Sequence, residues 1–253
     1  MRHALASGLQ ERGLKEDAAE QFELVSRLAV AGTGAAVNAD QQAGNLVGAK
    51  EPLRAAQRWQ QLLLHVLSPS TNFNEVEGYL TLPHIVHKAR ARAMLADNKP
   101  EQAVAELTKA RSTLPDDVRL IVEFVPKLDR AGQRAAAEEL FADGMAAHLR
   151  VCGEFPKSAT YHNNAAWLAA RSQRKLDDAL ALVTKAIELS PTEAAYQDTL
   201  AEVHFQRGER EAAVAAARQA LELSGDRKLF AARLKHFEND ELKTLDGTEA
   251  DGN

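Results

Sequence analysis

The side chains that could carry out covalent chemistry begin with the single cysteine, Cys152. A thiolate acts as a nucleophile when a neighbouring base or cation lowers its pKa. The flanking sequence, LRVCGEF, is largely apolar and gives no sign of such a shift. We therefore expect a buried structural thiol. A lone cysteine also cannot form an intramolecular disulfide, which fits a reducing, cytoplasmic location.

Two further groups of residues suggest metal or phosphate binding. His84 and His87 lie one helical turn apart, but two histidines do not complete a zinc site, and we expect them to pack against the connection at 68–83. The stretch Gly32-Thr33-Gly34 lacks the following Gly, Lys and Ser/Thr of a P-loop, and it is interpreted as a connection between helices. No hydrolase, metalloprotease or kinase signature is present. The sequence predicts a non-catalytic protein without a cofactor or a bound metal.

Composition and charge narrow the classes of partner. The 253 residues are 45% hydrophobic, only 5% aromatic, and carry a net charge of -5. That charge lies in residues 238–253, which hold six acidic residues and one basic residue, so the rest of the chain is neutral. A neutral body argues against nucleic-acid binding, and no apolar run reaches the roughly 18 residues of a membrane span. We interpret residues 239–253 as a disordered acidic tail.

The chain contains internal repeats, which show which elements must position any site. The segments 101–115 and 177–191 align, each with two alanines and a following proline at matching positions. Ala137 follows Ala103 at the same distance as Ala213 follows Ala179, and glycine precedes the later alanine of each pair at a fixed spacing. This distance, about 34 residues, is typical of paired helices stacked in an array.

This pattern resembles the tetratricopeptide repeat (TPR), a pair of antiparallel helices, A and B, with a turn between them. The resemblance implies an all-α fold, a right-handed α-solenoid of about six helical hairpins within one domain, 1–238. The expected repeats are 1–28, 33–67, 83–115, 117–152, 159–190 and 193–224, followed by a capping helix at 226–238.

Several features depart from a regular array. The second repeat is weak, because Gly44 and Gly48 each lower helix stability by about 1 kcal/mol relative to alanine. Pro126 falls inside a predicted helix and should kink it. The fourth repeat needs an extended second helix. We expect helices to be capped at their N-termini by Asp116, Ser158 and Thr192.

The TPR resemblance also implies a binding face. In such arrays the A helices line a concave surface, and side chains pointing away from helix B contact ligands. The residues at these positions carry carboxamide, charged or indole groups: Lys88, Arg92, Arg119, Glu123, Asn163, Asn164, Trp167, Asp198 and Glu202. Some TPR domains hold a partner's C-terminal carboxylate with a Lys/Asn/Arg clamp. Here Arg92 and Glu123 stand where asparagines are expected, so the match to that clamp is poor.

Asn163, Asn164 and Trp167 are the most informative members of this set. Asparagine is a poor choice for a helix interior, but its amide can bind a peptide backbone as both donor and acceptor. Trp167 adds a large apolar surface with one polar group. In the alternative interpretation, Trp167 packs between repeats and the asparagines satisfy loop backbone.

The sequence thus predicts a non-catalytic scaffold that binds a peptide segment of another protein on its concave face. Nucleic acid and membranes are not expected partners. The alternative is a regulatory or self-assembly repeat segment of a larger enzyme or complex, in which copies of the chain form a homo-oligomer.

Overall fold

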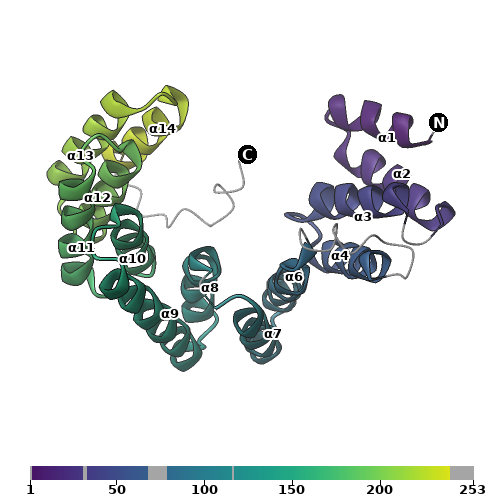
Figure 1. Ribbon diagram of the computed structural model, residues 1–253, viewed down its shortest axis with the longest axis horizontal. Coiled ribbons are helices and arrows are strands. Elements are labelled where there is room, and N and C mark those ends of the chain that lie inside the picture. The colour runs from purple at the N-terminus through teal and green to yellow at the C-terminus, as the bar shows by residue number, and fades with distance from the viewer. Residues whose placement is uncertain (1, 31–32, 68–78, 116, 240–253) are drawn as a thin grey trace. The chain divides into compact units, whose positions relative to one another are not determined.

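The computed structural model describes residues 2–30, 33–67, 79–115 and 117–239 (Figure 1). These residues form thirteen helices and no strand, which confirms the predicted all-α class. The helices are α1 (Arg2–Glu11), α2 (Lys15–Leu28), α3 (Gly34–Val47), α4 (Pro52–Val66), α6 (Leu82–Ala96), α7 (Pro100–Thr113), α8 (Val118–Arg130), α9 (Arg134–Glu154), α10 (Ala159–Arg171), α11 (Leu176–Leu189), α12 (Ala194–Gln206), α13 (Arg210–Leu223) and α14 (Arg227–Glu238).

The helices pair in chain order within two compact units, residues 1–115 and 116–253, called here the N-terminal and C-terminal units. In the N-terminal unit α1 packs on α2, α3 on α4 and α6 on α7. In the C-terminal unit α8 packs on α9, α10 on α11 and α12 on α13, while α14 covers α13 and α12. The predicted six hairpins and capping helix are therefore confirmed. The predicted single domain over 1–238 stays a prediction, and the predicted acidic tail lies outside the described residues except for Asn239.

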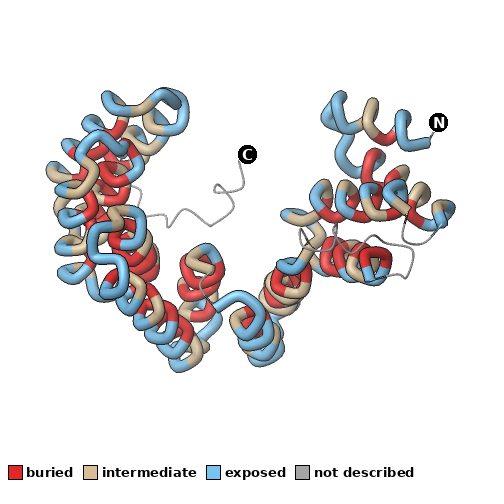
Figure 2. Tube along the Cα trace, viewed as in Figure 1, coloured by how far each residue is buried: buried red, intermediate tan, exposed pale blue. Residues whose placement is uncertain are grey.

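Small side chains at the repeat period allow the helices of each hairpin to pack closely. In each hairpin, the alanine near the start of the second helix is completely buried. Because its side chain is only a methyl group, the first helix of the hairpin can approach closely at this point. In Figure 2 buried and exposed residues alternate along most of the helices, whereas α1 and α14 are mostly exposed or intermediate. The buried alanines are Ala18, Ala55, Ala103, Ala137, Ala179 and Ala213.

Three hairpins turn through a glycine with left-handed backbone. Gly13, Gly132 and Gly208 have φ of 77°, 78° and 79°, a region that glycine enters without steric cost. In the hairpin of α6 and α7, Asn98 has φ 57°. The glycines that mark the period in the sequence are thus required by the backbone of the turn.

The left-handed turn leads to a first prediction. Gly132→Ala should lower the free energy of unfolding by about 1 kcal/mol, because alanine is strained at this φ. Gly153→Ala is the matched control: an added methyl group meets no atom within 4 Å at either position, but Gly153 lies in α9 without positive φ. Urea denaturation followed by circular dichroism would measure both changes. Equal effects of the two substitutions would contradict the backbone explanation.

Of the three predicted N-caps, Ser158 stands at the N-cap position of α10, Thr192 is wrong, and Asp116 lies outside the described residues. Helix α8 is capped by Asp117, which accepts a hydrogen bond from the Arg119 amide at 2.9 Å, while Asp116 is not described. Ser158 precedes α10 but makes no side-chain capping bond. The residue before α12 is Glu193, so Thr192 stands one position too early to cap it.

The predicted irregularities have different outcomes. Helix α9 extends over 21 residues, as expected for the fourth repeat. Helix α8 runs through Pro126 to Arg130, so the proline does not end the helix, and the kink expected there stays a prediction. The weak second repeat has a packing reason that the sequence did not reveal: Gly44 faces Trp59, and a methyl group on Gly44 would lie 2.5 Å from the indole nitrogen. The absent side chain makes room for the indole ring.

Candidate peptide-binding site

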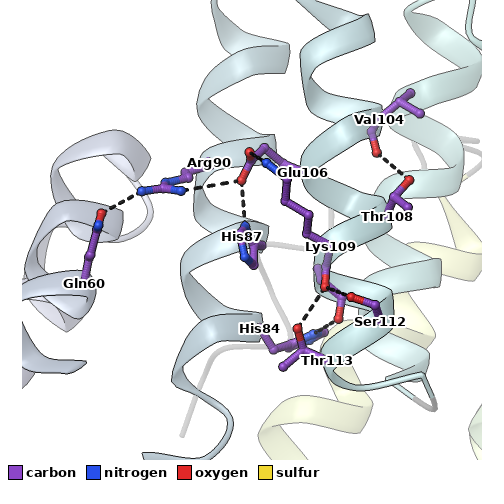
Figure 3. Close-up of polar contacts among 11 residues, drawn as sticks. Gln60, His84, His87, Arg90, Val104, Glu106, Thr108, Lys109, Ser112 and Thr113 are labelled. Atoms are coloured by element: carbon purple, nitrogen blue, oxygen red, sulfur yellow. Dashed lines mark hydrogen bonds and ion pairs between the residues drawn. The ribbon is translucent and has the colours of Figure 1, made fainter. Parts of the chain in front are cut away.

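The two histidines considered as metal ligands contact helix α7 on different turns (Figure 3). His84 is buried and its Nδ1 lies 2.9 Å from the carbonyl oxygen of Ala110. His87 Nδ1 lies 2.7 Å from Glu106 Oε2, and Lys109 donates to the other oxygen of that carboxylate at 2.8 Å. Burial raises the pKa of Glu106. The hydrogen bonds from His87 and Lys109 lower this pKa by more than burial raises it, so the net shift is downward. Both histidines therefore join α6 to α7, while most of the connection they were expected to contact lies outside the described residues.

The described residues contain no cluster of side chains that could bind a metal ion. No group of three or more His, Cys, Asp or Glu side chains is gathered closely enough there to hold an ion. Likewise, no described helix has the length and apolar character needed to cross a membrane. Thr33, from the glycine-rich stretch, instead caps helix α3 by accepting a hydrogen bond from the Ala36 amide at 3.5 Å.

Cys152 is buried in helix α9, and burial raises the pKa of its thiol. We expect alkylation by iodoacetamide at neutral pH to be at least about tenfold slower in the native chain than in urea, because the thiolate is the reacting species. Mass spectrometry would follow the rate. Native labelling as fast as in urea would show that the thiol is accessible and activated.

The nine predicted contact residues divide between the two units. Lys88 and Arg92 lie on α6 of the N-terminal unit, where both are half-buried and both have interaction partners. The other seven lie on the successive A helices of the C-terminal unit, α8, α10 and α12. Arg119 is exposed in the first turn of α8. Glu123 is almost buried one turn further along and accepts a hydrogen bond from Lys127 at 3.0 Å.

Helix α10 carries an unusual carboxamide. Asn163 is only 8% exposed, and its Oδ1 has no hydrogen-bond partner among the described residues. A buried polar atom left unpaired costs about 1–3 kcal/mol. Asn164 and Trp167 on the same helix are half-buried, and Trp167 follows Asn163 by one helical turn, so the two share a helix face. Asn164 and Trp167 thus give α10 a polar and aromatic surface, and the carboxamide of Asn163 lies buried beside it.

Helix α12 places its two carboxylates against the capping helix. Arg233 of α14 donates from Nε to Asp198 at 2.9 Å and from Nη2 to Glu202 at 2.8 Å. Glu202 is 1% exposed and also lies 3.5 Å from Arg171 of α10. The Arg233 guanidinium stacks on the Phe237 ring at 4.9 Å. Asp198 and Glu202 therefore form a buried ion-pair network that joins α10, α12 and α14.

The pKa values of this network reflect its pairing. Burial raises the pKa of Glu202, but Arg233, Arg171 and the Gln206 amide outweigh burial, and the net shift is downward. Burial lowers the pKa of Arg233, yet Asp198 and Glu202 raise it more. Glu202 and Arg233 therefore stay charged at neutral pH inside the array.

Sequence reasoning missed Arg233 and Arg171 as partners of the predicted site. A signal was present, since Arg233 follows Asp198 by 35 residues, about one repeat. The capping helix thus occupies the place of a seventh A helix. Applying the repeat period once more, beyond the last hairpin, would have placed a basic residue opposite the α12 carboxylates.

A second buried polar cluster lies in the N-terminal unit. Asp40 of α3 is fully buried, accepts a hydrogen bond from Ser26 Oγ at 2.8 Å, and lies 3.3 Å from His65 Nε2 and 3.6 Å from Arg58 Nη1. Burial raises the pKa of Asp40 by more than the surrounding hydrogen-bond donor and positive charges lower it, so the net shift is upward. The cluster ties α2, α3 and α4 together.

The chain is similar to solved structures, but no protein-family model and no curated protein matches it. Residues 41 to the end of MamA from Desulfovibrio magneticus RS-1 overlap with 74% of this chain and 94% of that chain, at 16% identity and a TM-score of 0.38. YrrB, described as a TPR protein with an unusual peptide-binding site, overlaps with 93% of this chain and 90% of that chain, at 15% identity and a TM-score of 0.34.

Another similar structure is the TPR2AB domain of yeast Sti1 in a complex with pHSP90, with 14% identity over 93% of this chain and 95% of that chain, and a TM-score of 0.35.

The class of the protein follows from its own geometry. Antiparallel hairpins recur at the period seen in the sequence, with buried alanines at one position and left-handed turns between helices. The chain is a TPR-like helical repeat protein.

Proposed function

We propose that the chain is a non-catalytic protein-binding module that holds an extended peptide segment of a partner on helix α10 of the C-terminal unit. The observation that supports this function most is the buried carboxamide oxygen of Asn163, which has no hydrogen-bond partner among the described residues. Native proteins rarely leave such an atom unsatisfied, and a peptide N–H would pair with it once the carboxamide turns outward from its buried position. Asn164 offers a second amide on the same helix.

Trp167 would supply the apolar contact beside these amides. A half-buried indole keeps a large surface available at little conformational cost, which is why tryptophan is frequent among the residues that dominate binding energy. The ion pairs of α12 with α14 and of Arg171 with Glu202 would hold the neighbouring helices rigid. A rigid surface loses little entropy when it binds a peptide. Arg119 and Glu123 remain proposed charged contacts of this unit, and Lys88 and Arg92 remain proposed contacts of the N-terminal unit by itself.

Peptide display on the immobilised full chain would test this function. Peptides selected from a random library should bind wild type and lose about tenfold or more of their affinity for Trp167→Ala, measured by fluorescence anisotropy. Asp178→Ala, an exposed position on α11, is the control and should leave the affinity unchanged. Selected peptides that bind Trp167→Ala as well as wild type would refute the assignment to α10.

Asn163→Leu separates a binding role from a structural one. We expect this variant to be as stable as wild type or more stable, because it removes an unpaired buried polar atom, while peptide affinity falls. Thermal unfolding and anisotropy would be measured on the same samples. A lower melting temperature with unchanged affinity would assign Asn163 to the core instead.

A further inference from the structure

Helix α12 carries carboxylates at the positions that hold the proposed peptide contacts on α10. The two helices have thirteen residues each, and Asn163 and Trp167 are the fifth and ninth residues of α10. The fifth and ninth residues of α12 are Asp198 and Glu202. Because equivalent positions of stacked repeats lie on the same face of an array, these carboxylates would continue the α10 site onto the neighbouring helix.

The guanidinium of Arg233 occupies this part of the face. Its Nε lies 2.9 Å and 3.2 Å from the two oxygens of Asp198, and its Nη2 donates to Glu202 at 2.8 Å. Two nitrogens of one planar group therefore bind two carboxylates, a geometry that the single ammonium of a lysine does not reproduce. The face of α12 thus fits a guanidinium, and the chain itself supplies that group from α14.

Helix α14 is held to the array by little buried surface. It packs against α13 and α12, yet Phe237 is the one residue of its twelve that is buried. The connection to α13 is three residues long, 224–226, and it includes Gly225, which is exposed and where an added methyl group meets no atom within 4 Å. A helix with one buried anchor and a short connection containing glycine can open while α12 and α13 stay paired.

We propose that α14 is a lid on the peptide site, and that a partner segment carrying an arginine binds Asp198 and Glu202 by displacing Arg233. This inference rests on the proposed function, because it extends the α10 site to the next helix. When the lid opens, Arg171 still lies 3.5 Å from Glu202, so one cation remains beside two carboxylates and the face attracts another. The closed lid lowers the apparent affinity for such a partner by the fraction of molecules in which it is open.

Removing the internal guanidinium should increase the binding of an arginine probe. Fluorescence anisotropy of labelled hexa-arginine would be measured on the full-length wild type and on Arg233→Ala, which keeps both carboxylates. We expect Arg233→Ala to bind hexa-arginine about tenfold or more tightly than wild type does, with a much smaller gain for hexa-lysine. Hexa-lysine has the same charge, so it controls for attraction to the acidic residues at the end of the chain. No gain for hexa-arginine, or an equal gain for both peptides, would overturn the proposal.

A second variant loosens the lid and leaves Arg233 in place. Phe237→Ala removes the buried anchor of α14, so this variant should also bind hexa-arginine more tightly than wild type does. Arg218→Ala is the matched control: it removes the exposed pair of α13 with Glu238 and should bind as wild type does. Circular dichroism would establish that both variants stay helical. A gain for Arg218→Ala as large as that for Phe237→Ala would contradict the lid.

Hydrogen exchange of the wild-type chain tests the displacement itself. Saturating hexa-arginine should speed the exchange of the α14 amides and leave those of α13 unchanged, because only the lid opens. Unchanged protection of α14 would refute the displacement. A gain in Arg233→Ala that Asp198→Asn abolishes would support the lid whether or not library peptides depend on Trp167. Library peptides that depend on Trp167, without this gain, would leave the proposed function standing and rule out the lid.

Discussion

Replacing Arg233 by methionine is expected to lower the free energy of unfolding of the C-terminal unit by about 3–5 kcal/mol. Methionine keeps much of the apolar volume but removes the cation that pairs with Asp198 and with Glu202. Glu202 is 1% exposed, so water cannot replace the lost partner, and this buried charge keeps only the part of its compensation that Arg171 at 3.5 Å and the Gln206 amide supply. Hydrogen exchange of the α12–α14 amides would measure the change in local opening energy.

The matched control for Arg233 lies one helix away. Arg218 of α13 pairs with Glu238 at 3.2 Å, but these side chains are 64% and 41% exposed. Arg218→Met should therefore change stability by no more than about 0.5 kcal/mol, because solvent screens an exposed pair. Should the two arginine variants lose the same stability, burial would not be the reason for the importance of Arg233.

The pH dependence of the Arg233→Met effect follows from the pKa of Glu202. In the wild type this pKa is lowered from its ordinary value of 4.5, so the pair's stabilisation is present above pH 4.5 and is lost as the pH falls through the lowered value. The difference between wild type and Arg233→Met should therefore be largest near neutral pH and shrink below pH 4.5. A difference that grows on acidification would contradict this assignment.

Gly44→Ala is the second substitution for which we expect a large effect, and its direction opposes helix propensity. Alanine favours a helix over glycine by about 1 kcal/mol. However, the added methyl group would lie 2.5 Å from Trp59 Nε1 and 2.9 Å from Cδ1, inside contact distance. Trp59 is buried among Val47, Leu62 and Val86 and has little room to move. Overpacking should outweigh the propensity gain and leave a net loss of about 2 kcal/mol.

Gly8→Ala is the control for Gly44. Gly8 lies in α1, and a methyl group there meets no atom within 4 Å. This substitution should be neutral or stabilising by up to about 1 kcal/mol. Urea denaturation of the full chain would compare the two variants, with Trp59 fluorescence reporting on the packing of α3 against α4. A stabilised Gly44→Ala variant would show that the indole ring can shift without cost.

The candidate site was partly predictable from sequence. Asn163, Asn164 and Trp167 are predictable because amides and an indole at helical spacing can bind a peptide, and their position on α10 follows from the repeat period. The period does not reveal that the Asn163 oxygen is buried and unpaired, since this depends on how α10 packs against its neighbours. The repeat period predicts Asp198 and Glu202 on the same face, yet both pair with Arg233, about one repeat further along the chain.

By itself the sequence determined the all-α class, the hairpin period, the glycines at the turns and the extended helix α9. These depend on local chemistry: alanines where helices cross, glycine where φ is positive, and apolar residues at helical spacing. Only the tertiary structure decided that Gly44 makes room for Trp59, that Arg233 binds the α12 carboxylates, and that the α4 leucines stay exposed. The physical reason is that contacts and burial depend on side chains brought together from distant repeats, whereas propensity and periodicity describe only each residue and its neighbours along the chain.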